Sequence, residues 1–433
     1  MADVFAELKW RGLINQTTDD VNIRAWLAER PRCVYAGFDP TADSLHVGHL
    51  MALMILRRFQ KAGHRPIALV GGATGMIGDP SGKSEERVLL SEESLQANIS
   101  GMEKQIRRLL DFDCGDQSAL VLNNYDWMGK FGYLDFLREV GKHFPVNVML
   151  TKDSVKSRLE RTDAGLSYTE FSYMLLQAYD FVHLNRHFDC EIQVGGSDQW
   201  GNITAGIDLA RRMNALESKS VQLHGATCPL LTKSDGAKMG KTESGALWLS
   251  PEKTSPYQFY QYWINLDDAD VGKCLRFFTD LEETEIEAVE TEHEADQSRR
   301  IAQRRLAEEL TRLVHDDEGL QTATRATEIF FGAEIEDLSD VQLGQIFADV
   351  SSSELARTDL EGEGLGIIDA LHVAGLAKSK GEARRTVTQG GAYVNNRRIT
   401  DIDARLTTEN LASETVMVLR SGKKRYALLR FVK

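Results

Sequence analysis

Two histidines, His46 and His49, stand three residues apart where an expected strand, Arg32–Phe38, gives way to an expected helix, His46–Ala62. Residues three apart share one face of a helix, and the free N–H groups of a helix N-terminus attract anions. Two imidazoles there could donate hydrogen bonds to a phosphate as charge develops on it, and Gly48 between them would let a flat ring approach the backbone. Taken alone, the pair is more often a surface feature or part of a zinc site, although H-x-x-H lacks the glutamate of H-E-x-x-H.

Two glycine–lysine segments could bring cations to a polyphosphate. Residues 78–84 and 236–242 each place three residues between their glycines, whereas a P-loop needs four, and residues 71–75 miss the G-x-G-x-x-G pattern of dinucleotide-binding folds. Neither a P-loop kinase nor a dinucleotide dehydrogenase is indicated. Taken alone, the lysines and arginine of these segments are more simply explained as solvated loop residues. They are Lys83, Arg87, Lys238 and Lys241.

The elements that must position these residues alternate between strand and helix over the first 215 residues. Strand-like runs are predicted at Arg32–Phe38, Pro66–Val70, Ser118–Leu122 and Glu191–Val194. Helices are predicted at His46–Ala62, Glu92–Phe112, Gly132–His143, Tyr168–Val182 and from Gly196 to about Met213. This alternation predicts an α/β fold with a parallel sheet covered by helices on both faces, and ligands bind such sheets at the carboxyl ends of the strands.

The second half of the chain has a different organisation. Residues 255–331 are predicted to be helical, residues 333–364 are acidic and weakly periodic and are predicted to be a linker, and the remainder mixes one helical piece, Lys380–Thr388, with short β-type runs. From Leu365 to Lys433 there are thirteen basic and six acidic residues, a local charge of +7 in a chain whose net charge is −14. A basic end on an acidic body suggests a polyanionic partner held at that end.

Composition bounds the class of protein. The 433 residues suffice for about three domains. The five cysteines contain no C-x-x-C pair, so neither a disulfide framework nor a zinc cluster is indicated, and a reducing cytoplasm fits best. No membrane span or secretory signal is recognisable.

In combination the motifs carry more weight than singly. His46-Val-Gly-His49 with Lys238-Met-Gly-Lys241-Thr242 resembles the HIGH and KMSKS pair of class I aminoacyl-tRNA synthetases. Residues 35–46, 71–75, 78–83, 169–180 and 193–202 look like the bacterial-type tyrosyl-tRNA synthetase family, and residues 379–395 resemble an S4-type RNA-binding domain. The resemblance spans nearly the whole chain.

The resemblance implies a domain plan and a reaction. It implies a Rossmann-like catalytic domain over 1–250, an α-helical anticodon-arm domain over 251–332, the acidic linker over 333–364 and a small α+β S4-like RNA-binding domain over 365–433. Tyrosine would attack the α-phosphate of ATP, supplied with Mg²⁺, and the tyrosyl-adenylate would then esterify the 3′ end of tRNA(Tyr). A cytoplasmic homodimer, with residues 130–165 near its interface, is also implied.

The resemblance further assigns roles to individual residues. Those implied to stabilise the reacting phosphates are His46, His49, Lys238, Lys241, Thr242, Lys83 and Arg87. Those implied to bind tyrosine are Tyr35, Thr74, Asp79, Asn124, Tyr173, Gln177, Asp180 and Gln199. Those implied to bind ATP are Asp39, His46, Gly48, His49, Gly196, Asp198 and Lys241. Those implied to bind tRNA are Lys380, Arg384 and Arg385. No dedicated metal-ligand set is expected.

Departures and rivals are few. Val47 replaces the isoleucine of the motif, Gly240 stands where the wider class has serine, and Ala36 puts in doubt a polar contact to the ribose that some members make. A tryptophanyl enzyme would require an indole pocket and normally lacks the S4-like tail. A non-catalytic RNA-binding protein on a decayed scaffold is disfavoured by the intact histidine and lysine sets.

Overall fold

The computed structural model describes residues 2–80, 90–152, 155–156, 159, 165–216, 221–242, 245–336, 338–347 and 350–432. These residues form two compact units, one of residues 1–253 with 263–314 and the other of residues 254–262 with 315–433. One division between the units falls after Lys253, near the domain boundary expected at 250, and none falls at the boundary expected at 332. Among the described residues, no helix has the length and apolar character needed to cross a membrane.

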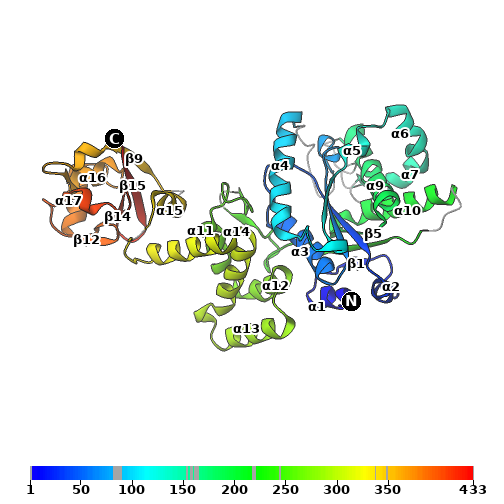
Figure 1. Ribbon diagram of the computed structural model, residues 1–433, viewed down its shortest axis with the longest axis horizontal. Helices are drawn as coiled ribbons and strands as arrows, with labels where there is room; N and C mark the ends of the chain where they lie inside the picture. Colours follow the sequence, from blue (N-terminus) through cyan, green and yellow to red (C-terminus); the bar gives the residue numbers. More distant parts are fainter. Residues whose placement is uncertain are drawn as a thin grey trace. The chain divides into compact units, whose positions relative to one another are not determined.

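The first unit is built on a six-stranded sheet in the order β1-β6-β5-β2-β3-β4 (Figure 1). Strands β2 to β6 are parallel and β1 is antiparallel to β6. The strands are β1 (Gln16–Thr17), β2 (Cys33–Phe38), β3 (Arg65–Val70), β4 (Leu120–Asn123), β5 (Cys190–Gly196) and β6 (His224–Cys228). The α/β prediction is therefore confirmed, although β1 and β6 were not foreseen.

Helices cover both faces of this sheet. Figure 1 shows α4 (Glu92–Leu109) on one side of the strands and α9 (Tyr168–Phe188) with α10 (Trp200–Leu216) on the other. Alternate residues of the strands, such as Tyr35, Ile67 and Leu69, join the core beneath α9 and α10. Helix α3 (Val47–Lys61) packs against β2 and β3. Shorter helices complete the unit: α1 (Val4–Trp10), α2 (Ile23–Glu29), α5 (Tyr125–Met128), α6 (Tyr133–Glu139) and α7 (Val146–Met149).

The short hairpin of β7 (Lys241–Thr242) and β8 (Gly245–Ala246) is followed by α11 (Pro256–Ile264). Three more helices come after α11. They are α12 (Asp268–Phe278), α13 (Glu283–Ala295) and α14 (Ile301–Phe330). Asp316 interrupts α14 with φ 62° and ψ −173°, and its carboxylate accepts hydrogen bonds from the N–H groups of Glu318 and Gly319. Asp316 thus starts a second helix, and the division between the two units falls at this point.

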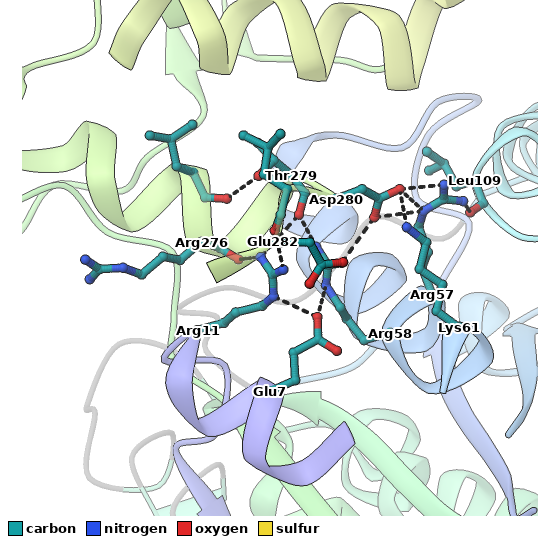
Figure 2. Close-up of polar contacts among 12 residues, drawn as sticks. Glu7, Arg11, Arg57, Arg58, Lys61, Leu109, Arg276, Thr279, Asp280 and Glu282 are labelled. Carbon is teal, nitrogen blue, oxygen red and sulfur yellow. Dashed lines mark hydrogen bonds and ion pairs between the residues drawn. The ribbon is translucent and has the colours of Figure 1, made fainter. Parts of the chain in front are cut away.

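A partly buried ionic network ties the end of α12 to α1 and α3 (Figure 2). Asp280 accepts from Arg57 at 2.7 Å, from Arg58 at 3.2 Å and from Lys61 at 2.8 Å, all on α3. Arg11 of α1 donates to the carbonyl oxygens of residues 276, 279 and 281. Burial acts to raise the pKa of Asp280, but Arg57, Lys61 and Arg58 together hold it well below its usual range. The network therefore fixes the C-terminal end of α12 to the helix that begins at the two histidines.

The second unit contains a five-stranded sheet in the order β12-β11-β14-β15-β9. The strands are β9 (Ser352–Ala356), β11 (Ala392–Val394), β12 (Arg397–Ile399), β14 (Val416–Ser421) and β15 (Arg425–Val432). One face packs on α16 (Ile367–Val373) and α17 (Lys380–Thr388), and the other packs on α15 (Asp340–Ile346) and the end of α14. A separate pair joins β10 (Leu365–Gly366) and β13 (Arg405–Leu406).

The linker predicted for residues 333–364 is wrong as a structural description. This segment contains α15 and also β9, which pairs in parallel with β15 over five residues. Strand β9 carries one acid, Glu354, at an exposed position, while Leu360 is buried in the core beneath α16. Composition alone missed this pattern because the segment is rich in acids and its short strand has no fully buried residue, so it looks like a solvated segment.

Candidate active site

The two histidines form the start of α3. His46 is the N-cap, and its Nδ1 accepts from the N–H of Gly48 at 3.0 Å, while its own N–H donates to Nδ1 of His49 at 3.2 Å. The two rings stack with centroids 3.9 Å apart. Because each Nδ1 is an acceptor, each neutral ring carries its proton on Nε2, where it can donate to an oxyanion. A side chain at residue 48 would collide with the ring of His46 at 2.8 Å, so glycine is required there.

The histidines open onto a cavity of about 630 Å³ at the carboxyl ends of the central strands. The cavity lies where the chain order reverses, between β2 and its neighbour β5, which is the place where doubly wound sheets bind ligands. Its size falls within the usual range for small-molecule sites, roughly 300–1,000 Å³. The residues predicted from sequence that line it are Tyr35, Asp39, His46, Gly48, His49, Thr74, Asp79, Asn124, Tyr173, Gln177, Asp180, Gly196, Asp198, Gln199, Lys238 and Lys241.

One part of the cavity wall is a buried carboxylate. Asp180 on α9 is 2% exposed and accepts from Nδ2 of Asn124 at 3.0 Å and from Nε1 of Trp127 at 2.8 Å. Burial raises the pKa of Asp180 to about 7, although these two hydrogen bonds act to lower it. Because Asp180 lines the cavity, its carboxyl can accept a hydrogen bond from a ligand, or donate one when protonated.

The hydroxyl of Tyr35 lines the same cavity. It is buried, and no residue in the described part of the chain is hydrogen-bonded to it. Burial and the nearby carboxylate of Asp180 raise the pKa of Tyr35. A buried polar group without a partner costs roughly 1–3 kcal/mol. A ligand that carries a hydroxyl group would relieve this cost.

A chain of amide and carboxylate groups forms another wall. Gln199 donates to Asp79 at 2.8 Å, Gln177 donates to Gln199 at 3.2 Å, and Asn202 donates to Gln177 at 2.8 Å. Each amide is oriented by its neighbour, so the carboxylate of Asp79 is held in a defined place at the cavity. An anionic group there suits an ammonium group of a ligand.

A second carboxylate, Asp39, follows β2. It accepts from the hydroxyl groups of Thr74 at 2.8 Å and Tyr173 at 2.9 Å. The backbone of Gly71 passes so close that a Cβ atom there would lie 2.2 Å from Asp39. Gly71 is therefore needed for close packing against Asp39, because a side chain at that position would collide with the carboxylate.

The cationic side of the cavity is formed by the loop that contains Lys238 and Lys241, both exposed. Lys238 acts to lower the pKa of Asp198, but burial has the larger effect and raises it. Gly240, at φ +77°, lies next to Val47. The loop is therefore adjacent to the start of α3, and cations and imidazoles line the same space.

Some predicted residues fall elsewhere. Lys83 and Arg87, and the side chain of Thr242, lie outside the part of the chain that the structure describes. Lys380, Arg384 and Arg385 are exposed on α17 of the second unit. Their assigned roles remain predictions.

Sequence reasoning assigned no role to several residues at or beside the cavity. Gln193 and Thr41 line the cavity, and Trp127 donates to Asp180 from a helix 53 residues earlier in the chain. Gln193 is a polar residue in a buried strand, which is a signal that could have been used. Trp127 offers no local signal.

Comparison with known proteins agrees with the geometry. The family model "tRNA synthetases class I (W and Y)" matches residues 27–332, and "Tyrosine--tRNA ligase SYY-like C-terminal domain" matches residues 342–429. The chain is 60% identical to the tyrosine–tRNA ligase of Rhodopirellula baltica, over 98% of this chain and 95% of that one. It is 50% identical to that of Geobacillus stearothermophilus, over 99% and 100%.

Solved structures show the same fold. A C-terminally truncated mitochondrial tyrosyl-tRNA synthetase of Aspergillus nidulans matches with TM-score 0.68 and 31% identity, covering 76% of this chain and 95% of that one. A tryptophanyl-tRNA synthetase of Plasmodium falciparum matches with TM-score 0.52 and 14% identity, covering 79% and 87%, which shows the fold alone. The fold is therefore shared by both branches, while the extensive sequence identity is to tyrosine-specific proteins. The chain belongs to the class I aminoacyl-tRNA synthetases, in the tyrosyl-tRNA synthetase family.

Proposed function

We propose that the cavity between the ends of β2 and β5 performs both steps of the family's reaction. The family membership makes the chain an ATP-dependent, tyrosine-specific aminoacyl-tRNA ligase. In the first step a carboxylate oxygen of tyrosine attacks the α-phosphorus of ATP, and the bond to pyrophosphate breaks. In the second, a ribose hydroxyl at the 3′ end of tRNA(Tyr) attacks the carbonyl carbon and adenosine monophosphate leaves.

Tyrosine would be held at both of its polar ends. Asp180 and the hydroxyl of Tyr35, which has no partner among the described residues, suit the phenol group, since one can accept and the other can donate. Asp79, oriented through Gln199 and Gln177, suits the ammonium group. Asn124 and Thr74 hold the carboxylates of Asp180 and Asp39 in place. The aromatic ring would then lie between these two polar ends.

The phosphates would meet the opposite wall. Nε2 of His46 and His49 would donate to the α- and γ-phosphates as negative charge spreads, and Lys238 and Lys241 would neutralise the departing pyrophosphate. Asp39, Gly48, Gly196 and Asp198 would hold the adenosine. We propose that ATP arrives as its Mg²⁺ complex, because Mg²⁺ commonly binds through substrate phosphates. Lys83, Arg87 and Thr242 are assigned supporting contacts by the resemblance alone.

One observation carries this proposal. The buried carboxylate of Asp180 and the buried hydroxyl of Tyr35, which has no hydrogen-bond partner within the described chain, share a cavity with the imidazole donors of two histidines. The test is amino-acid-dependent exchange of pyrophosphate into ATP, measured with each of the twenty standard amino acids. Exchange should depend on tyrosine. Stimulation by tryptophan in place of tyrosine would contradict the assigned substrate.

Transfer to tRNA would use surfaces beyond the cavity. The exposed Lys380, Arg384 and Arg385 on α17 suit RNA phosphates, because basic side chains supply most of the affinity for a nucleic-acid backbone. We also assign the helical segment 251–332 to the anticodon arm, as the family resemblance implies.

A homodimer is proposed for the surface around α6 and α7. Large apolar side chains are exposed there, and a cluster of this kind commonly marks a protein contact. They are Tyr133, Leu134, Val146, Val148 and Leu150. Leu134, the most exposed of these, is a suitable site for Leu134→Glu, which should shift the sedimentation coefficient from dimer to monomer. We further propose a cytoplasmic location, where tRNA charging takes place.

A further inference from the structure

Helix α12 places a buried carboxylate beneath the loop that carries Lys238 and Lys241. Asp270 is 0% exposed, and its carboxylate accepts from the N–H of Ser234 at 2.9 Å and from the Ser234 hydroxyl at 3.4 Å. One turn later, Lys273 donates to the carbonyl oxygen of Thr232 at 2.7 Å and to Asp270 at 3.2 Å. Two charged side chains of α12 therefore hold the loop at two points, Thr232 and Ser234.

Holding the loop at these two points also fixes the position of residues 237–239, which are hydrogen-bonded to its first arm. The N–H of Met239 donates to the carbonyl of Leu231 at 3.1 Å, and the N–H of Lys233 donates to the carbonyl of Ala237 at 2.8 Å. The loop is thus a tight turn with two bonded arms, and fixing its first arm fixes the arm that leads to Lys238. Met239 also seats against Cys274 of α12, with the two sulfur atoms 3.5 Å apart.

The opposite end of α12 is anchored as well. The Asp280 network fixes it to the C-terminal part of α3, whose N-terminus carries the two histidines (Figure 2). Helix α12 thus connects the lysine loop with the histidine helix. A rigid element bonded to both is suited to keep the cations and imidazoles in register.

Burying a carboxylate is costly unless hydrogen bonds compensate, and those that Asp270 accepts come from the loop and from Lys273. We propose that Asp270 is a positioning residue for adenylate formation: it holds the loop so that Lys238 and Lys241 face the phosphates of ATP. This inference rests on the proposed function of the site. The competing explanation is purely structural, in which an acid in the first turn of α12 only stabilises that helix.

The test measures tyrosyl-adenylate formation in a single turnover, with the dissociation constant of tyrosine and the melting temperature measured alongside. Asp270→Ala should slow adenylate formation about tenfold or more, because a misplaced lysine loses its charge-assisted contact with the phosphates in the transition state, and should leave tyrosine affinity within about twofold. Asp270→Asn, which keeps an acceptor for the Ser234 N–H, should recover part of the rate. If Asp270→Ala does not fold, Asp270→Asn and Lys273→Met carry the same test.

Two further measurements separate positioning from general stability. Asp267→Asn, which changes an exposed acid at the N-cap of the same helix that makes no side-chain cap, should react at close to the wild-type rate. A double-mutant cycle with Lys241→Ala should be strongly non-additive, because the second change removes a group that the first has already misplaced. Multiplicative effects, or a fall in melting temperature with an unchanged rate, would overturn the inference. Tyrosine-dependent exchange by the wild type would still stand as a separate result.

Discussion

At the scale of single residues, the hydroxyl of Tyr35 allows the discrimination between tyrosine and phenylalanine to be tested directly. It is buried in the cavity, so a ligand with a phenol group satisfies it and phenylalanine leaves it unpaired. Tyr35→Phe should therefore narrow the tyrosine-to-phenylalanine ratio of kcat/KM by about tenfold, the value of one neutral hydrogen bond. Tyr179→Phe, on the same helix as Asp180 and away from the cavity lining, is the control. An unchanged ratio in Tyr35→Phe would place the discrimination elsewhere.

The start of α3 allows capping and catalysis to be separated. His46 both caps the helix through Nδ1 and offers Nε2. His46→Ala should lose about 1 kcal/mol of stability together with the rate of adenylate formation. His46→Asn should restore the cap, because asparagine is a good N-cap, but not the rate. Recovery of the rate in His46→Asn would mean that the imidazole serves only the helix.

Asp180 should leave a mark on the pH dependence of stability. Its pKa in the folded chain is about 7, well above the ordinary value of 3.8. Between about pH 4 and pH 7 the folded chain holds a proton that the unfolded chain has lost, so the free energy of unfolding falls as pH rises. Above pH 7 the loss is complete. Asp180→Asn should lack this decline, and melting temperatures of both proteins from pH 4 to 8 would reveal it; parallel curves would contradict the assignment.

At the scale of elements, the ion pairs of Asp280 join the end of α12 to α3 within the first unit. Removing one partner of a fully buried ion pair costs about 3–5 kcal/mol, and solvent access to the partly exposed Asp280 makes the cost here smaller. Asp280→Ala should therefore lower the melting temperature strongly, because it strands Arg57 and the buried Arg58. Glu287→Ala, which removes an exposed acid of α13, should change it little.

The stabilisation that Asp280 contributes depends on pH in the opposite direction to that of Asp180. The pKa of Asp280 is depressed, so its stabilisation is fully present above the unfolded value of about 3.8 and disappears as pH falls toward the folded value. The difference in melting temperature between wild type and Asp280→Ala should therefore shrink below pH 4. A difference that stays constant with pH would show that packing, and not charge, is responsible.

The elements also show how far sequence could predict this molecule. Strand β2 and helix α3 were predictable, because a buried run ends at a polar loop and an apolar period of 3.6 begins at His46. The hydrogen bond between Trp127 and Asp180 was not, since it depends on the packing of α5 against α9 across 53 residues. Strand β9 was missed for another reason: none of its residues is fully buried and its pairing with β15 is long-range, so local composition does not reveal it.

At the scale of the whole molecule, the second unit constrains any truncation. A chain that ended near Glu361 would keep β9 but lose its partner β15, leaving an unpaired strand. A chain that ends at Gly332 removes both together. It should keep tyrosine-dependent pyrophosphate exchange and lose most charging of tRNA, as measured by incorporation of labelled tyrosine. Because Ile329 and Phe330 pack against the removed sheet, this shortened chain will expose apolar surface, and its solubility must be checked first.

Point substitutions test the same module with its fold intact. Arg384 and Arg385 are exposed on α17, so Arg384→Ala with Arg385→Ala should weaken tRNA binding without affecting adenylate formation. If each arginine binds one phosphate, the slope of log affinity against log salt should fall by about 1 for each arginine removed. Lys423→Ala with Lys424→Ala, in the turn between β14 and β15, removes the same charge from the same unit and is the matched control. Equal slopes for the two double variants would mean that the unit attracts tRNA by its overall charge, whereas a weaker slope confined to the arginine pair would place the phosphate-binding residues on α17.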